Sequence, residues 1–271
     1  TLSHLELESP LTSDIEGIAR PVSHWVKTSF SSKNISQDGA EAINIANNDP
    51  GKIATLILPA DTAWGEAKDI VKAETVIPRQ KVSQENIINI AKILTNGNNS
   101  TLVLGGKALN EKCTELAGKI AAKTGCGIIT ESANARLSRG EGRVKMLRIP
   151  GAGVVDRAIE MLEKAGQLIL VGSKPPVAFF GYPNKPSLLY KKGTPLHTLV
   201  QTEEDIYSAL LGLVDELDAT NLKPAYIADY NRPEIPKGNI TKENLAKVIG
   251  ALIEENTIVV DESVTTGRDF F

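Results

Sequence analysis

A turn rich in hydroxyl groups follows the last apolar run of the sequence, and its residues could bind a phosphate. The run at 257–261 reads Thr-Ile-Val-Val-Asp and predicts a buried strand, after which Glu-Ser-Val-Thr-Thr-Gly follows at 262–267. Open α/β sheets bind ligands beyond the carboxyl ends of their strands, and hydroxyl and backbone N–H donors suit a phosphate. Composition leaves two interpretations open here, an ordinary strand-to-helix turn or a phosphate site.

Two glycine pairs lie where a phosphate-binding loop could lie, but both patterns are incomplete. Gly-Gly-Lys at 105–107 follows a predicted strand, yet Ala108 replaces the hydroxyl residue of such a loop and the upstream glycine is missing. Gly-Ala-Gly at 151–153 precedes a predicted helix, with Asp156 in place of the third glycine of a dinucleotide fingerprint. The first pattern therefore favours a tight turn that serves packing, and the second is too short to indicate a dinucleotide site.

The sequence lacks the usual patterns of metal sites and nucleophiles. Its three histidines, at positions 4, 24 and 197, have no cysteine or carboxylate at ligand spacing. Cys113 and Cys126 lie in or beside predicted core elements, which favours small buried residues over nucleophiles. No G-x-S-x-G elbow is present. We therefore expect neither a metal ligand nor a catalytic residue in this chain.

Basic residues cluster in one long polar segment, 131–150. The segment is either a solvated loop or a site for an anionic cofactor, and the sequence alone leaves both interpretations open. The clustered residues are Arg136, Arg139, Arg143, Lys145 and Arg148.

Composition excludes several classes of protein. The 271 residues are 41% apolar and 23% charged, with a formal net charge of −3, as in soluble globular domains. That charge provides no positive field for a nucleic acid. No apolar run approaches the ~20 residues that span a bilayer, and no signal-peptide pattern opens the sequence. We expect a cytoplasmic protein without a nucleic acid or membrane partner.

Strands and helices alternate in the middle of the chain, which predicts an open parallel sheet covered on both faces. A helix at 39–46 and a buried strand at 53–58 precede this region, and a linker at 219–238 leads to a helix after Thr241. Each flanking piece is expected to be an incomplete domain, and Trp25 and Trp64 are expected to anchor packing in the first. The central elements are predicted as helices at 83–94, 110–124, 154–165 and 205–217 and strands at 101–104, 127–130, 167–172, 187–190 and 196–200.

Three segments in fixed order carry a family resemblance. They read PLTSDIEGIARPVSHWV near the start, PGKIATLILPAD at 50–61 and IVVDESVTT at 258–266. Together they resemble thiamine-diphosphate-dependent enzymes of the acetolactate synthase and benzoylformate decarboxylase group. The resemblance implies that 1–78 is the later part of a pyrimidine-binding domain, 79–218 a central doubly wound, Rossmann-like sheet of six parallel strands, and 239–271 the start of a diphosphate-binding domain.

The same resemblance implies a cofactor, thiamine diphosphate with Mg²⁺, in the parent protein. Ser263, Val264 and Thr265 match the turn that touches the cofactor diphosphate in the family. The catalytic glutamate and the Mg²⁺-binding G-D-G segment are expected before Thr1 and after Phe271, so this chain alone is expected to be inactive. FAD, which some members hold, is not expected because 149–153 does not match their glycine-rich pattern.

The activity implied for the parent is decarboxylation of a 2-oxo acid, with or without transfer to a second carbonyl. Family sites form between subunits, so a homodimer or homotetramer is expected. The alternative is a free-standing α/β module that binds a nucleotide or a partner subunit without catalysis.

Overall fold

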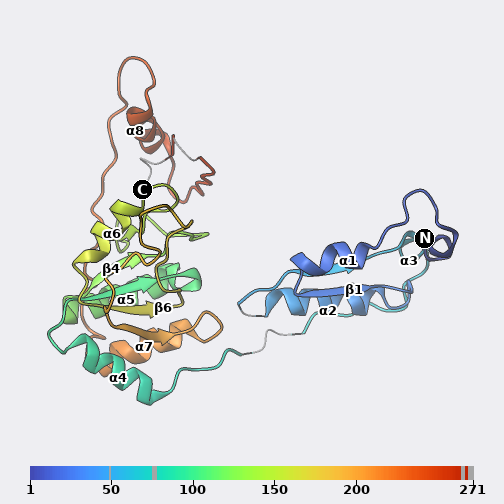
Figure 1. Ribbon diagram of the computed structural model, residues 1–271, viewed down its shortest axis with the longest axis horizontal. Helices are drawn as coiled ribbons and strands as arrows, with labels where there is room; N and C mark the ends of the chain where they lie inside the picture. Colours follow the sequence, from blue (N-terminus) through green and yellow to red (C-terminus); the bar gives the residue numbers. More distant parts are fainter. Residues whose placement is uncertain (49, 75–77, 264–265, 268–271) are drawn as a thin grey trace. The chain divides into compact units, whose positions relative to one another are not determined.

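The computed structural model describes the chain except for residues 49, 75–77, 264–265 and 268–271. The described residues form two compact units, which divide between Gln80 and Lys81 (Figure 1).

The smaller unit, 1–80, is built around two short parallel strands. Strand β1 (Trp25–Thr28) pairs with β2 (Ala54–Ile57), so that Trp25 lies opposite Ala54. Helix α2 (Ile35–Asn47) connects them, which makes this a βαβ unit and confirms the predicted helix and strand. The remaining elements are the helices η1 (Leu2–Leu7), α1 (Ile15–Ala19), η2 (Arg20–Val22) and α3 (Ala60–Trp64).

Burial in this unit is shallower than the sequence predicts. All four residues of β2 are only partly buried, so the prediction of a strand buried on both faces is wrong. The cause is the small size of the sheet. A parallel strand is buried on both faces in a wide sheet that helices cover on both sides, and this sheet has two strands. Trp64 is 77% exposed and does not anchor packing, whereas Trp25 is partly buried in β1.

An ion-pair cluster compensates in part for this small core. The Lys27 ammonium on β1 lies 2.8 Å from the Asp38 carboxylate and 2.7 Å from the Glu41 carboxylate, both on α2. Burial is the largest single influence on Asp38 and opposes its ionisation, but the hydrogen bonds of Lys27 and Ser29 and the charge of Lys27 together outweigh it and lower the pKa of Asp38. The hydrogen bonds to Asp38 and Glu41 raise the pKa of Lys27. The cluster therefore joins α2 to the sheet.

Replacing Asp38 by asparagine is expected to destabilise this unit by about 1–2 kcal/mol at neutral pH, since it removes a charge-assisted hydrogen bond. A lowered folded-state pKa contributes stability above the unfolded value of about 3.9, and that stability is lost as the pH falls through the folded value. The difference between wild type and Asp38→Asn should therefore shrink below about pH 4. Hydrogen exchange of the α2 amides at several pH values measures it. Asp69→Asn, at an exposed position, is the control, and an equal effect of both changes would contradict the assignment.

The larger unit, 81–271, contains a parallel sheet of five strands in the order β5-β4-β3-β6-β7. The fold class is as predicted, but the sheet has five strands instead of six. The strands are β3 (Ser100–Leu104), β4 (Gly127–Thr130), β5 (Leu147–Arg148), β6 (Gln167–Val171) and β7 (Leu196–Val200).

The predicted strand at 187–190 does not form. Leu188 makes only an isolated antiparallel bridge with Val177. Its backbone is used by the loop at 176–178 instead: the Ala178 N–H donates to the Ser187 carbonyl at 2.8 Å and the Leu189 N–H to the Pro176 carbonyl at 3.2 Å. The segment is instead a covering loop whose Leu189 side chain is buried.

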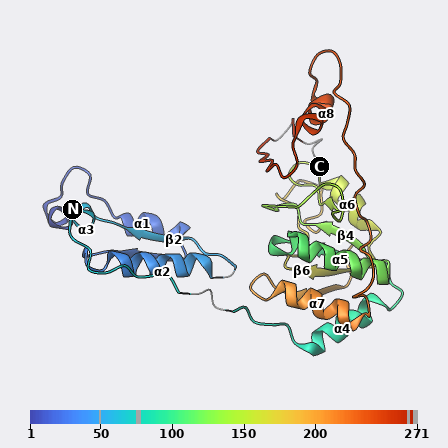
Figure 2. The same ribbon diagram turned by 180° about the vertical axis from the view of Figure 1, so that it is seen from behind.

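Helices cover both faces of the sheet (Figures 1 and 2). Alternate strand residues divide between two cores: Leu102 and Ile169 face one, and Val103 and Leu168 face the other. The first core packs against α4 (Gln84–Leu94), α5 (Glu111–Thr124) and α7 (Ile206–Glu216), and the second against α6 (Val155–Glu163). A short helix, η3 (Gly106–Leu109), follows β3.

The segment 219–238, predicted as a linker, packs on this unit. The Ala225 N–H donates to the Gly118 carbonyl at 2.9 Å, and the Tyr226 hydroxyl donates to the Cys126 carbonyl at 3.1 Å. Val144 also bridges to Ile227. Residues 225–227 of this segment therefore pack beside α5 and β4.

The last described elements differ most from expectation. Helix α8 (Lys242–Leu252) forms behind the predicted Thr241 cap, but none of its residues is buried. The predicted buried strand at 257–261 is wrong, because Ile258 and Val260 are 83% and 79% exposed and the segment joins no sheet. A parallel strand needs a neighbour to share its hydrogen bonds, and no described strand supplies one here.

Candidate functional site

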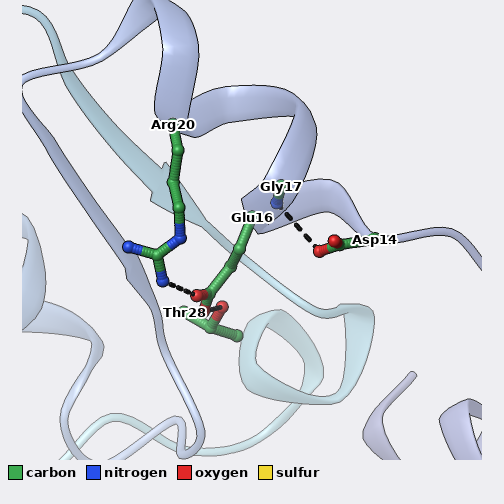
Figure 3. A network of polar contacts seen from close by, with 5 residues as sticks. All are labelled: Asp14, Glu16, Gly17, Arg20 and Thr28. Carbon is green, nitrogen blue, oxygen red and sulfur yellow. Dashed lines mark hydrogen bonds and ion pairs between the residues drawn. The ribbon is translucent and has the colours of Figure 1, made fainter.

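The first of the three segments that carry the resemblance forms a network of polar contacts in the amino-terminal unit, as Figure 3 shows. Asp14 caps α1 by accepting from the Gly17 N–H at 2.8 Å. The Glu16 carboxylate accepts from the Arg20 guanidinium at 2.6 Å and from the Thr28 hydroxyl at 2.7 Å. These bonds join α1 to the end of β1, so the motif fixes the position of α1 against the sheet.

The second segment forms β2 and the start of α3. Thr62, which is buried, donates its hydroxyl to the Pro59 carbonyl at 2.6 Å. The carboxylate of Asp61 accepts from the Leu2 N–H at 2.9 Å through one oxygen, while its other oxygen is buried and finds no partner among the described residues. This segment therefore ends the strand in a tight, partly unsatisfied turn.

Of the three predicted cofactor contacts, only Ser263 lies within the described residues; Val264 and Thr265 lie outside them. The Ser263 N–H and hydroxyl both donate to the same oxygen of Asp261, at 2.9 and 2.6 Å. These hydrogen bonds, and more weakly the charge of Arg148, lower the pKa of Asp261. In this arrangement Ser263 would have to release Asp261 before it could donate to a diphosphate.

The basic segment 131–150 brings charges of both signs together. It lines an open hollow of about 770 Å³ with the 227–232 segment and the end of α8. Burial, and then the nearby charge of Arg148, lowers the pKa of Arg139. Carboxylates balance the cations of the lining, which favours a solvated, mixed surface over an anion site. The cations are Arg139, Arg143, Lys145 and Arg232, and the carboxylates are Glu141, Asp229, Glu254 and Glu255.

The cysteines are core residues, as predicted. Cys113 and Cys126 are both buried. Burial raises the pKa of the Cys126 thiol to about 11, so this group stays protonated at neutral pH and is a poor nucleophile.

The two glycine pairs behave differently. Gly105 and Gly172 approach closely: a Cβ built on Gly105 would lie 2.7 Å from the Gly172 carbonyl oxygen. A Cβ built on Gly151 would meet nothing within 4 Å. Only the first pair therefore serves close packing, at the carboxyl ends of β3 and β6.

Sequence reasoning missed Glu131, which follows β4 directly. Its carboxylate accepts from the Gly106 N–H at 3.2 Å. The signal that could have found it is positional, because a carboxylate after the second strand lies beside the glycine turn after the first strand in doubly wound sheets.

Metal sites and membrane-spanning helices were also sought among the described residues. Among the described residues, no group of three or more histidine, cysteine or carboxylate side chains could hold a metal ion. A search of those residues also finds no helix that is long and apolar enough to cross a membrane.

Comparison with known proteins finds a curated relative that matches nearly the whole chain. No family model matches the chain. A protein of Mycobacterium tuberculosis, provisionally named acetolactate synthase large subunit IlvX, is 34% identical over 265 residues, which are 97% of this chain and 50% of that protein. The chain thus spans about half the length of this curated relative.

Solved structures show the same architecture. A thiamine-diphosphate-dependent 4-hydroxybenzoylformate decarboxylase of Rhodococcus jostii RHA1 matches 99% of this chain and 54% of its own, with a TM-score of 0.77 and 17% identity. Benzoylformate decarboxylase of Polynucleobacter necessarius matches 88% of this chain and 46% of its own, with a TM-score of 0.62 and 18% identity. The predicted resemblance is therefore confirmed: over nearly its whole length, the chain is similar in sequence to a protein named as an acetolactate synthase large subunit and similar in fold to the two decarboxylase structures.

Proposed function

We propose that this chain is part of a thiamine-diphosphate-dependent enzyme that decarboxylates a 2-oxo acid, with or without transfer to a second carbonyl. The observation that carries the proposal is the 34% identity to an acetolactate synthase-like relative over nearly the whole chain. The proposed cofactors are thiamine diphosphate and Mg²⁺, the proposed assembly is a homodimer or homotetramer, and the proposed location is the cytoplasm.

The domain assignment belongs to the same proposal. Residues 1–78 would contribute to the pyrimidine-binding domain, 79–218 form the central domain and 239–271 begin the diphosphate-binding domain. The division of the structure into units at 80/81 supports the first boundary, and the parallel sheet within 100–200 supports the central domain. When bound, thiamine diphosphate supplies a carbon nucleophile and electron sink for loss of CO₂.

The residues proposed to contact the diphosphate are Ser263, Val264 and Thr265. Ser263 has two donors suited to a phosphate oxygen, its N–H and its hydroxyl, and both are held by Asp261 in this structure. Since a carboxylate occupies those donors, cofactor binding requires the turn to change its hydrogen bonds.

The test compares this chain with a polypeptide extended to the length of the Mycobacterium tuberculosis relative. Calorimetric titration with thiamine diphosphate and Mg²⁺ measures binding, and CO₂ release from pyruvate and from benzoylformate measures activity. We expect the extended polypeptide to bind the cofactor and release CO₂ from a 2-oxo acid. A folded, extended polypeptide that binds no thiamine diphosphate would overturn the proposal.

A variant of Ser263 tests the predicted contact. In the extended polypeptide, Ser263→Ala is expected to weaken cofactor binding by about two- to tenfold, the effect of one hydrogen bond of 0.5–1.5 kcal/mol. Ser187→Ala, at an exposed position of the larger unit, is the matched control and should leave the affinity for the cofactor unchanged. The non-catalytic alternative predicts binding of ADP without any CO₂ release.

A further inference from the structure

The central sheet has the topology that normally creates a ligand crevice. The chain runs outward from β3 to β4 and β5 on one side, and from β6 to β7 on the other. The switch point therefore lies between β3 and β6, at whose carboxyl ends open α/β sheets bind ligands. We call the residues there, Gly105, Gly106, Glu131, Gly172 and Lys174, the switch-point crevice.

Backbone bonds hold Glu131 firmly at this edge. Its N–H donates to the Leu104 carbonyl at 3.0 Å, which continues the pairing of β3 with β4. Its own carbonyl accepts from the Asn134 amide at 3.0 Å and from the Thr130 hydroxyl at 3.1 Å. The side chain therefore starts from a fixed position and points into the crevice.

The carboxylate of Glu131 lies against both neighbouring turns. It accepts from the Gly106 N–H after β3 at 3.2 Å, and the backbone and charge of Lys174, after β6, favour its ionised form. Burial is the largest influence on this group and raises its pKa, while the Gly106 N–H and Lys174 act in the opposite direction. Backbone N–H groups of such turns are the donors that bind phosphate in nucleotide sites.

Space in the crevice is also filled. A Cβ built on Gly105 would lie 2.7 Å from the Glu131 side chain as well as from the Gly172 carbonyl. The Ser173 side chain turns inward and donates to the Val103 carbonyl at 2.7 Å, so its hydroxyl is committed too. A phosphate entering here would compete for donors already in use and would meet a carboxylate.

We infer that Glu131 takes the place of a ligand phosphate in the switch-point crevice, so that the central sheet rejects nucleotide diphosphates and dinucleotides such as ADP and FAD. The carboxylate acts as a specificity-determining group: it joins three strand ends and repels the anion for which the topology would otherwise provide a site. The inference concerns the central sheet alone and does not depend on the proposed catalytic function.

Binding of ADP and of FAD to the full chain tests the inference. Isothermal titration measures ADP binding, and quenching of flavin fluorescence measures FAD binding, for wild type, Glu131→Ala and Glu131→Gln. Wild type should show no saturable binding up to millimolar ligand. Glu131→Ala frees the Gly106 N–H and removes the repulsion, and should bind ADP saturably with a Kd of about 0.1 mM or lower, at least tenfold (1.4 kcal/mol) tighter than the millimolar limit for wild type.

A matched variant separates this local effect from a loss of overall negative charge. Glu141→Ala removes the same charge from an exposed position of the same segment and should bind like wild type. Glu131→Gln retains the side-chain volume, so it decides the question if Glu131→Ala does not fold, and it should also gain affinity. Saturable micromolar binding of either ligand by wild type would overturn the inference, as would a folded Glu131 variant that binds no better than Glu141→Ala.

Discussion

Replacing Ile169 by alanine is expected to destabilise the larger unit by about 2–5 kcal/mol, the range for deleting most of a fully buried aliphatic side chain. Ile169 lies at the middle of β6, with no exposed surface, between Leu102 on β3 and His197 on β7. It belongs to the core that α4, α5 and α7 cover. A cavity here is enclosed by strands on two sides and helices above, so little collapse can offset the loss.

Hydrogen exchange of the β3 and β6 amides is the suitable measurement, because a chain of two units need not unfold in a single transition. Ile169→Val removes one methyl group and should cost about 0.5–1.5 kcal/mol. Leu147→Ala, on a strand residue that is 60% exposed, should change stability by less than about 0.5 kcal/mol. Equal protection in Ile169→Ala and Leu147→Ala would contradict the assigned core.

Local patterns in the sequence predicted the central elements well. Ser83, Asn110 and Thr241 each accept a hydrogen bond from the backbone two or three residues into a helix, as capping residues do. Helical spacing of apolar residues predicted the helices at 83–94 and 110–124, which are α4 and α5 in the structure. Such signals are local, which is why one sequence suffices to find them.

Features that depend on distant partners were predicted less well. The apolar runs at 53–58 and 257–261 both suggested strands buried on two faces, but burial depends on how many strands and helices surround a run. The first run became a half-covered strand in a pair, and the second stayed exposed and joined no sheet. An apolar run specifies the tendency to be buried and leaves its partner unspecified.

The site residues show the same division. The glycine pair at 105–106 was predicted as a packing turn, and its contact with Gly172 confirms that interpretation. Glu131 went unnoticed because its role comes from the topology, which brings the ends of β3, β4 and β6 together. The sequence signal that could have found Glu131 is its position directly after the second strand of a doubly wound sheet, and that signal has meaning only once the strand order is known.

Replacing Gly105 by alanine is the second change with a large expected effect, about 1–3 kcal/mol or more of destabilisation from overpacking. The backbone at Gly105, with φ of −138°, suits any residue, so the effect is steric. The new Cβ would lie 2.7 Å from both the Glu131 side chain and the Gly172 carbonyl oxygen. The side chain can move aside, whereas the carbonyl belongs to the turn after β6 and cannot move without shifting that strand end.

A double-mutant cycle separates these two contacts. If the Glu131 side chain causes part of the strain, Gly105→Ala should cost less in a Glu131→Ala background, and the residual cost measures the clash with Gly172. Gly151→Ala adds the same methyl group where nothing lies within 4 Å, and its stability should stay near that of wild type. Hydrogen exchange of the β6 amides measures all four variants against wild type. If Gly105→Ala were as stable as Gly151→Ala, the close approach of the β3 and β6 turns, and with it the filled crevice, would have to be abandoned.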